Sequence, residues 1–297
     1  MLDAAITEKL WNWAERYNNP RYFEEDPIAF PRRFYRMMTT VQPSLGFEGG
    51  EWRPSLQDIE IAAVFAAHLA WGRRSTIIKD CSRLFDEMLW RPYDYVMAGD
   101  WRNDATSLHR TVKWSETAAI CRRLKAFYSG EISGTARTEN SLRSGDGSAV
   151  IPPIAGDGSL PLTLPGVACL PEGNSPSSQG GRRSLEELSA SEMRTLIYGQ
   201  KPDPKAANKK IWMMRRWMVR DDGRVDLGVW KHSSKQDLVI PLDVHVYRQA
   251  SELGLTKRRS KDFATAMEIT DAFREIFPDD PAKGDFALFG YGVTRNA

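Results

Sequence analysis

SLQDIEIAAVFAAHLAWG, residues 55–72, decides the fold class of this chain of 297 residues. Ser55 and Asp58 have the spacing of a capping box, in which side chains and backbone amides at a helix start pair reciprocally. From Ile59 to Trp71 nearly every residue is apolar, so the helix has no face that suits water. Gly72 is a residue suited to end it. A helix of this kind belongs in the middle of a bundle, and the sequence therefore predicts an all-α fold.

The regions on either side of this helix repeat the helical pattern. Asp26-Pro27 and Pro31 indicate a turn-rich entry segment, because proline restricts the residue before it. Extended segments are expected only at 225–230 and 238–240, which are short. Apolar residues at helical spacing, together with capping residues, predict further helices at 4–17, 75–89, 115–128, 184–199, 211–219, 243–254 and 260–277.

Residues 133–183 differ from the rest in composition. They are dense in Gly, Ser and Pro and show no helical period, which is typical of a disordered or inserted segment. We expect an inserted flexible surface loop there. It separates an N-terminal helical part, 1–132, from a C-terminal helical part, 184–297, as two lobes of one fold.

Composition excludes several classes of protein. The three cysteines, Cys81, Cys121 and Cys169, are far apart and form no CxxC pair, so we expect neither a metal nor another cofactor. The N-terminus lacks the order of a signal peptide, and no apolar run approaches the ~20 residues that cross a bilayer. A cytoplasmic protein without membrane contact is expected, and no obligate protein partner is evident.

The formal net charge is only +2, but positive charge gathers late in the chain. Residues 201–224 contain eight Lys and Arg residues against three Asp, interleaved with Trp212 and Trp217. Such a patch suits a polyanion, because each neutralised phosphate releases counterions. Alternatively the charges line the wet face of an amphipathic helix, and the two Trp residues belong to the core. The candidate phosphate contacts in this segment are Lys205, Arg215, Arg216 and Arg220.

Asp243 directly precedes a predicted helix, in the run Pro241-Leu242-Asp243-Val244-His245-Val246. An Asp in that position accepts hydrogen bonds from free backbone N–H groups at the helix start. These bonds also fix the direction of the carboxylate. From the residues alone, Asp243 is either a helix cap or a reactive carboxylate.

The run 241–246, followed by Arg248 and Leu253-Gly254, resembles the signature of the helix-hairpin-helix DNA glycosylases. In that superfamily the Asp faces the sugar whose base is removed, and bifunctional members add an upstream Lys after a hairpin that grips a phosphate. Upstream, 203–211 resembles the hairpin-to-helix junction of the archaeal 8-oxoguanine glycosylases. The resemblance places the family Lys on Lys209, with Lys210 as the second candidate. It departs from the pattern at 205–207, where Lys-Ala-Ala replaces Gly-x-Gly.

The chain also resembles, more closely, the bacterial family called domain of unknown function 2400. The matching runs cover nearly everything outside the inserted loop: 26–28, 30–31, 58–62, 72–74, 216–220, 225–228, 230, 241–246 and 285–290. The two resemblances together imply a glycosylase-like helical bundle with a long inserted loop.

The expected function is DNA repair, by a base-excision DNA glycosylase with abasic-site lyase activity through Lys209 and Asp243. A carboxylate can stabilise the positive charge that builds on the sugar, and a neutral amine can attack the anomeric carbon. The expected partner is DNA, with RNA as the alternative, and no metal is expected. One alternative is a non-catalytic DNA- or RNA-binding protein, and another is a helical protein whose basic face binds nothing specific. Further candidate nucleic-acid contacts are Arg73, Arg74, His245 and Arg248.

Overall fold

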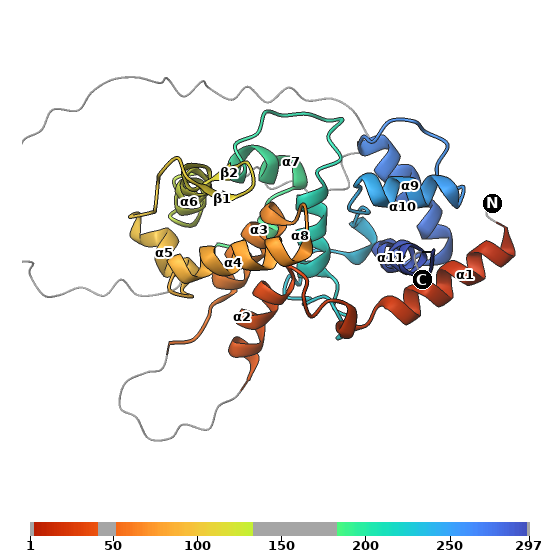
Figure 1. Ribbon diagram of the computed structural model, residues 1–297, viewed down its shortest axis with the longest axis horizontal. Coiled ribbons are helices and arrows are strands. Elements are labelled where there is room, and N and C mark those ends of the chain that lie inside the picture. Colours follow the sequence, from red (N-terminus) through yellow and green to blue (C-terminus); the bar gives the residue numbers. More distant parts are fainter. Residues whose placement is uncertain (1–2, 41–51, 133–182, 296–297) are drawn as a thin grey trace, which may run out of the picture. The chain divides into compact units, whose positions relative to one another are not determined.

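The computed structural model describes residues 3–40, 52–132 and 183–295. All of these belong to one compact unit. Apart from Arg183, the expected inserted loop lies outside the described residues. The described part is mostly helical, with one small antiparallel hairpin of β1 (Ser107–His109) and β2 (Val112–Lys113) (Figure 1). The expected all-α class is confirmed.

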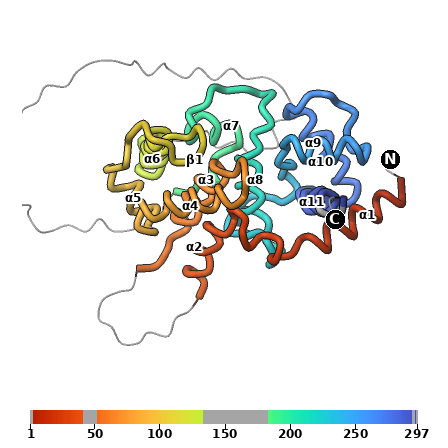
Figure 2. The backbone as a smooth tube through the Cα atoms, viewed as in Figure 1, coloured from red at the N-terminus to blue at the C-terminus, as the bar shows by residue number. Residues whose placement is uncertain are grey.

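Helix α3 (Leu56–Leu69) lies at the centre of one group of helices. Its capping box forms as expected between Ser55 and Asp58, and twelve of its fourteen residues are buried. The helices α2 (Ala29–Thr39), α4 (Arg74–Glu87), α5 (Pro92–Ala98) and α8 (Lys209–Val219) pack against it. Figure 2 shows the close approach of α3 and α8. Because α3 is apolar all round, every side of it needs such a neighbour.

Glu60 is the polar exception inside α3 and is fully buried. Its carboxylate accepts hydrogen bonds from Ser184 Oγ, the Leu185 N–H, Trp230 Nε1 and Tyr128 Oη. Burial raises the pKa of Glu60 to about 7, and the four donors oppose that rise. The side chain therefore joins three distant segments of the chain to the central helix.

A second group contains α1 (Ala4–Tyr17), α9 (Val244–Glu252), α10 (Phe263–Ile276) and α11 (Gly284–Arg295). Both α1 and α9 pack against α11, so helices from the two ends of the chain lie together (Figure 1). Aromatic pairs hold the contact: the rings of Trp13 and Tyr291 are 5.4 Å apart, and those of Tyr17 and Phe289 are 5.8 Å apart.

The β hairpin leads into α6 (Trp114–Tyr128) and is anchored by a buried histidine. His109 Nδ1 lies 2.8 Å from Asp80 Oδ2, and its Nε2 lies 2.9 Å from the Trp71 carbonyl oxygen. The remaining helical turns are short: η1 (Pro20–Tyr22), η3 (Leu185–Glu187), α7 (Ala190–Glu192), η4 (Met193–Ile197), η5 (Lys235–Asp237) and η6 (Pro281–Lys283).

The single helix expected at 184–199 is wrong. The capping box of Ser184 and Glu187 forms, but it starts only the turn η3. Leu188 is extended, and a second capping box at Ser189 and Glu192 starts α7, which continues as the π-helical turn η4. Two start signals five residues apart divide the segment.

The expected helix start at Ser260 is also displaced. α10 begins at Phe263, because the Asp262 side chain caps it by accepting from the Thr265 N–H. The helices α2, α5 and α11 add to those expected. The segments 225–230 and 238–240 pair in no sheet among the described residues.

Candidate active site

The starts of α8 and α9 face a shared open pocket of about 510 Å³, here called the Lys209 pocket. Its other walls come from the segment before α2, the connection between α3 and α4, and α11. Gly72 lies in that connection with φ of +105°, a conformation that favours glycine. Five segments that are distant in sequence therefore meet around one cavity, whose size lies in the usual range for small-molecule sites.

Lys209 and Asp243 meet in this pocket. The Lys209 Nζ lies 3.3 Å from Asp243 Oδ2 and 3.3 Å from the carbonyl oxygen of Ala70, at the end of α3. Both side chains keep about a third of their surface exposed, at 33% and 29%. The amine is therefore held by two acceptors and remains open to the pocket.

The two carboxylate oxygens of Asp243 have different partners. Oδ1 accepts from the His245 N–H at 2.8 Å and from the Val246 N–H at 2.9 Å, which makes it the cap of α9. Oδ2 faces Lys209. The cap fixes the direction of the carboxylate, and the second oxygen is turned toward the amine and the cavity. The two roles that the sequence left open are therefore compatible in one residue.

More charged groups surround this pair. Arg216 contacts Asp285 and Asp226, while Arg74 lies 3.7 Å from Asp26. Burial raises the pKa of Asp285; the Arg216 guanidinium opposes this rise, and the negative charge of Asp243 adds to it. Burial likewise raises the pKa of Asp26, against the Ile28 N–H and Arg74. The pocket thus contains both signs of charge close together.

One wall of the pocket is apolar and aromatic. Phe23 packs with its ring 5.5 Å from Phe286 and 5.4 Å from Phe289. Trp217 and Met213 of α8 complete this wall. Flat rings next to polar groups suit a ligand that has an aromatic ring and a polar edge.

Gln249 of α9 is a buried amide on the pocket wall. Its side chain hydrogen-bonds to none of the described residues, although its amide offers two donors and an acceptor. Gly292 of α11 makes room for it, because a Cβ there would lie 2.1 Å from Gln249 Nε2. The amide is therefore free to bind a polar ligand edge.

Six of the residues singled out from the sequence line the Lys209 pocket: Lys209, Asp243, Arg216, Arg74, His245 and Arg248. His245 and Arg248 are exposed on α9. The six residues come from three separate parts of the chain, and the fold brings them together around one pocket.

The prediction of a solvent-exposed basic face on α8 is wrong. Arg215, Arg216 and Arg220 are buried. Arg220 pairs with Asp226, Asp280 and Asp222, and Arg215 donates to the Leu188 carbonyl oxygen at 2.8 Å. Carboxylates from later segments neutralise the cluster and let it enter the interior, where unpaired charges would be costly. Trp212 and Trp217 are buried too, as the alternative interpretation expected.

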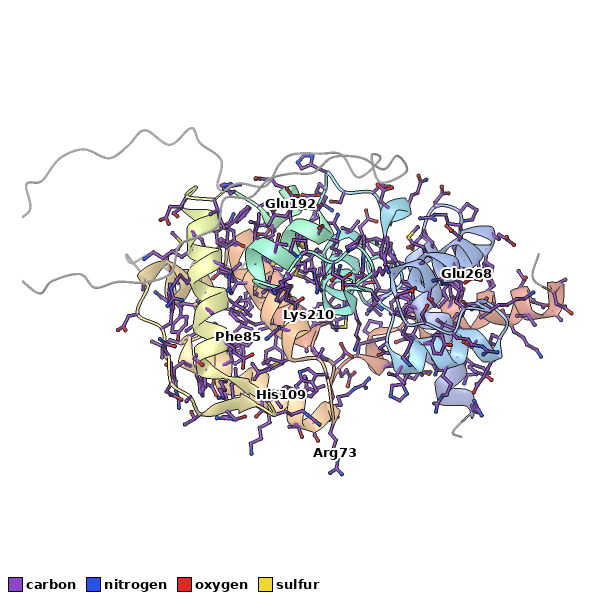
Figure 3. The ribbon with its side chains drawn as sticks, turned by 90° about the horizontal axis from the view of Figure 1, so that it is seen from above. Arg73, Phe85, His109, Glu192, Lys210 and Glu268 are labelled. Carbon is purple, nitrogen blue, oxygen red and sulfur yellow. The ribbon has the colours of Figure 1, made fainter. Side chains whose placement is uncertain are left out.

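Lys210, the second candidate amine, does not line the Lys209 pocket. Its Nζ lies 3.1 Å from His68 Nδ1 and 4.3 Å from the centre of the Tyr198 ring. Burial lowers the pKa of Lys210 to about 8, and the charge of Arg194 adds to this effect. In Figure 3 Lys210 lies among the packed helices. The structure therefore separates the two neighbouring lysines into different surroundings.

Lys205 and Arg73 also lie outside the pocket lining. Lys205 is exposed in the turn before α8, where its N–H donates to Asp203 Oδ1 at 2.9 Å. Arg73 is exposed at the start of α4 and points away from the helices (Figure 3). Both side chains are exposed and can reach a phosphate, but neither of them contacts Lys209.

Asp26, Asp285 and Gln249 are pocket residues that the sequence analysis did not single out. A signal existed for Asp285, because it lies in the run 285–290 that resembles domain of unknown function 2400. Gln249 gave no signal, since an amide inside an amphipathic helix has no distinctive pattern.

Membrane-spanning helices and metal clusters are both absent from the described residues. None of their helices combines the length and apolar character that a bilayer crossing requires. They also contain no cluster of three or more His, Cys, Asp or Glu side chains arranged to hold a metal ion.

Comparison with known proteins gives one match. No curated protein matches the chain, and no solved structure does. A family model described as a protein of unknown function, DUF2400, matches residues 53–146 and 175–294, which is more than half of the chain. The matched residues include the central helix α3 and the first residues of α8 and α9. The chain therefore belongs to the DUF2400 family.

Proposed function

We propose that the protein is a DNA glycosylase with abasic-site lyase activity, in which Lys209 is the nucleophile and Asp243 its acidic partner. One observation carries the proposal: an amine and a carboxylate 3.3 Å apart share an open pocket with an aromatic wall. A capping Asp needs no lysine at its second oxygen. The helix-hairpin-helix resemblance of 203–211 and 241–254 supports the same pair.

The chemistry requires the amine to lose its proton. Asp243 Oδ2 is the acceptor within reach of Lys209 Nζ. The free amine attacks C1′ of the target nucleotide, and the base leaves with the bonding electron pair and takes up a proton. Ring opening gives an iminium between Nζ and C1′. Loss of a proton from C2′ then expels the 3′ phosphate, and water releases the enzyme.

Asp243 has a second role in the proposal. The sugar becomes positively charged as the base departs, and a fixed carboxylate beside it lowers the energy of that state. Its two bonds to the N–H groups of α9 hold the carboxylate in position before the substrate arrives. In the aromatic wall, Phe23 and Phe286 are buried, and the partly buried ring of Phe289 is the one that offers a surface to a base that has left the stack.

Borohydride trapping tests the proposal. The protein is incubated with a duplex containing an abasic site or one of a panel of damaged bases, and borohydride reduces the iminium to a stable amine. We expect a covalent protein–DNA band from the wild type and none from Lys209→Ala.

Lys201→Ala is the matched control, because Lys201 is an exposed lysine eight residues away that does not line the pocket. It should trap as the wild type does. If the wild type forms no adduct with any substrate, the enzymatic function is lost. Salt-dependent binding without turnover, indifferent to Asp243→Asn, would then indicate a non-catalytic nucleic-acid-binding protein.

A further inference from the structure

Helix α2 carries three arginines and no carboxylate between Ala29 and Thr39. Phe30 and Phe34 face the core, whereas Arg33 and Arg36 are exposed and Arg32 is half-buried. Arg32 and Arg36 are four residues apart, so they lie on the same side of the helix. The arginines of α2 therefore reach the surface, whereas those of α8 are buried.

Two hollows meet at these arginines and together form what we call the α2 groove. One, of about 380 Å³, is lined by Arg32, Arg36 and Lys231, among others. The second, of about 710 Å³, is lined by Arg32, Arg33 and Arg36, with Glu24 as its carboxylate. Because both are lined by Arg32 and Arg36, the two hollows adjoin at these side chains of α2.

Charges in the first hollow do not balance locally. Its carboxylates are both engaged: Asp226 is bound by Arg216 and Arg220, and Asp221 lies 2.9 Å from Lys235. Neither Arg36 nor Lys231 forms an ion pair within 4 Å with a carboxylate of the described residues, and Lys231 acts on Asp221 only at longer range.

Arg32 completes this positive set. Its Nη2 donates to the Val225 carbonyl oxygen, and Arg32 forms no ion pair within 4 Å with a carboxylate of the described residues. Burial lowers the pKa of Arg32 and the nearby charge of Arg36 lowers it further, while the charges of Asp226 and Asp26 oppose this shift. An anion between the two guanidinium groups would relieve that repulsion.

The α2 groove adjoins the Lys209 pocket. Asp26 and Pro27, which directly precede α2, line that pocket. Arg216 lines the pocket as well, and its partner Asp226 lines the groove. The buried Arg216–Asp226 ion pair therefore links the lining of the pocket to the lining of the groove.

We propose that the α2 groove binds the phosphate backbone of the DNA strand that flanks the nucleotide in the Lys209 pocket, with Arg36 and Lys231 as its main phosphate contacts. Arginine suits phosphate because its donors match two oxygens at once, and lysine supplies a mobile point charge. The choice of DNA rests on the proposed function. The groove, however, makes its own prediction about binding, which does not require turnover.

The test is the salt dependence of binding to a duplex that contains tetrahydrofuran in place of an abasic nucleotide. This analogue has no aldehyde, so binding is measured apart from iminium chemistry. Fluorescence anisotropy is recorded across a range of salt concentrations. Each lost phosphate contact should reduce the slope of log K against log salt by about 1. We expect Arg36→Ala combined with Lys231→Ala to reduce the slope by about 2.

Two control variants accompany it. Lys9→Ala with Lys79→Ala removes the same charge from exposed positions on α1 and α4, and its slope should equal that of the wild type. Arg36→Lys with Lys231→Arg keeps both charges and should restore the slope. An equal loss in the α1/α4 control would mean that only net charge matters, and the groove would be rejected.

The remaining outcomes separate this inference from the proposed function. If the slope changes as expected but the wild type traps no abasic DNA, the groove stands and the lyase function fails. If trapping occurs but the Arg36 and Lys231 variant keeps the wild-type slope, the lyase function stands and the groove fails. A wild type that does not bind the duplex at low salt also overturns the groove.

Discussion

Asp243 offers a substitution series that separates its structural role from its chemical role. One of its oxygens caps α9 through two backbone N–H groups, and the other contacts Lys209. Asparagine can keep the cap but carries no charge. Alanine removes the cap and the charge together.

The stability effects follow from the exposure of the pair. Because both partners are about a third exposed, losing the ion pair costs at most about 1 kcal/mol. Asn and Asp cap helices about equally well, whereas replacement by Ala costs about 1 kcal/mol more. We therefore expect Asp243→Asn to lower the free energy of unfolding by less than about 1 kcal/mol. The free energy of unfolding of Asp243→Ala should be about 1 kcal/mol lower than that of Asp243→Asn.

Urea titration followed by Trp fluorescence measures the stabilities, and single-turnover cleavage of abasic DNA measures the rate. Removing one preorganised electrostatic partner typically costs a factor of about 100 to 1,000, so we expect that loss in both variants. An Asp243→Asn protein that keeps the wild-type rate would refute the chemical role. Equal stability of the Asn and Ala variants would refute the cap.

Three further substitutions test the packing. Since the folded state holds a proton on Glu60 up to about pH 7, the free energy of unfolding should fall by about 3 kcal/mol between pH 4.5 and 7, and urea titrations of Glu60→Gln should lack that fall. Asp226→Ala leaves two buried arginines without their shared partner, so the free energy of unfolding should drop by about 3–5 kcal/mol; an unchanged urea midpoint would contradict the buried network. Lys210→Met removes a desolvated cation and should raise stability at pH 7 by about 1 kcal/mol, after allowance for solvent screening. That advantage should shrink as the pH rises from 8 to 10.5, because only the unfolded wild type then stays protonated, and a pH-independent difference would argue against it.

Local signals in the sequence were sufficient to predict the central helix of the fold. The Ser55–Asp58 capping box and the apolar run after it predict a buried helix, because both features act within a few residues. Helix α2 escaped the same reasoning because Pro27 and Pro31 indicated turns. Pro31 instead lies in the first turn of α2, where a missing N–H removes no helical hydrogen bond.

The candidate site was predictable only in part. The resemblance led to Lys209 and Asp243, which the fold brings together. The burial of Arg216 and Arg220 could not be read from residues 201–224, because it depends on Asp280 and Asp285, which lie 60 or more residues later. A local count of charges contains no information about such distant partners. The arginines of α2 gave no signal, because the segment around Pro27 and Pro31 was expected to be turn-rich and not helical.

The identity of the trapped residue tests the central claim most directly. Tandem mass spectrometry of the borohydride-reduced complex, after digestion of protein and DNA, locates the sugar remnant on one lysine. The Lys209–Asp243 geometry predicts that it lies on Lys209. A remnant on Lys210 or Lys205 instead would contradict the assignment of the nucleophile and with it the role of the pocket.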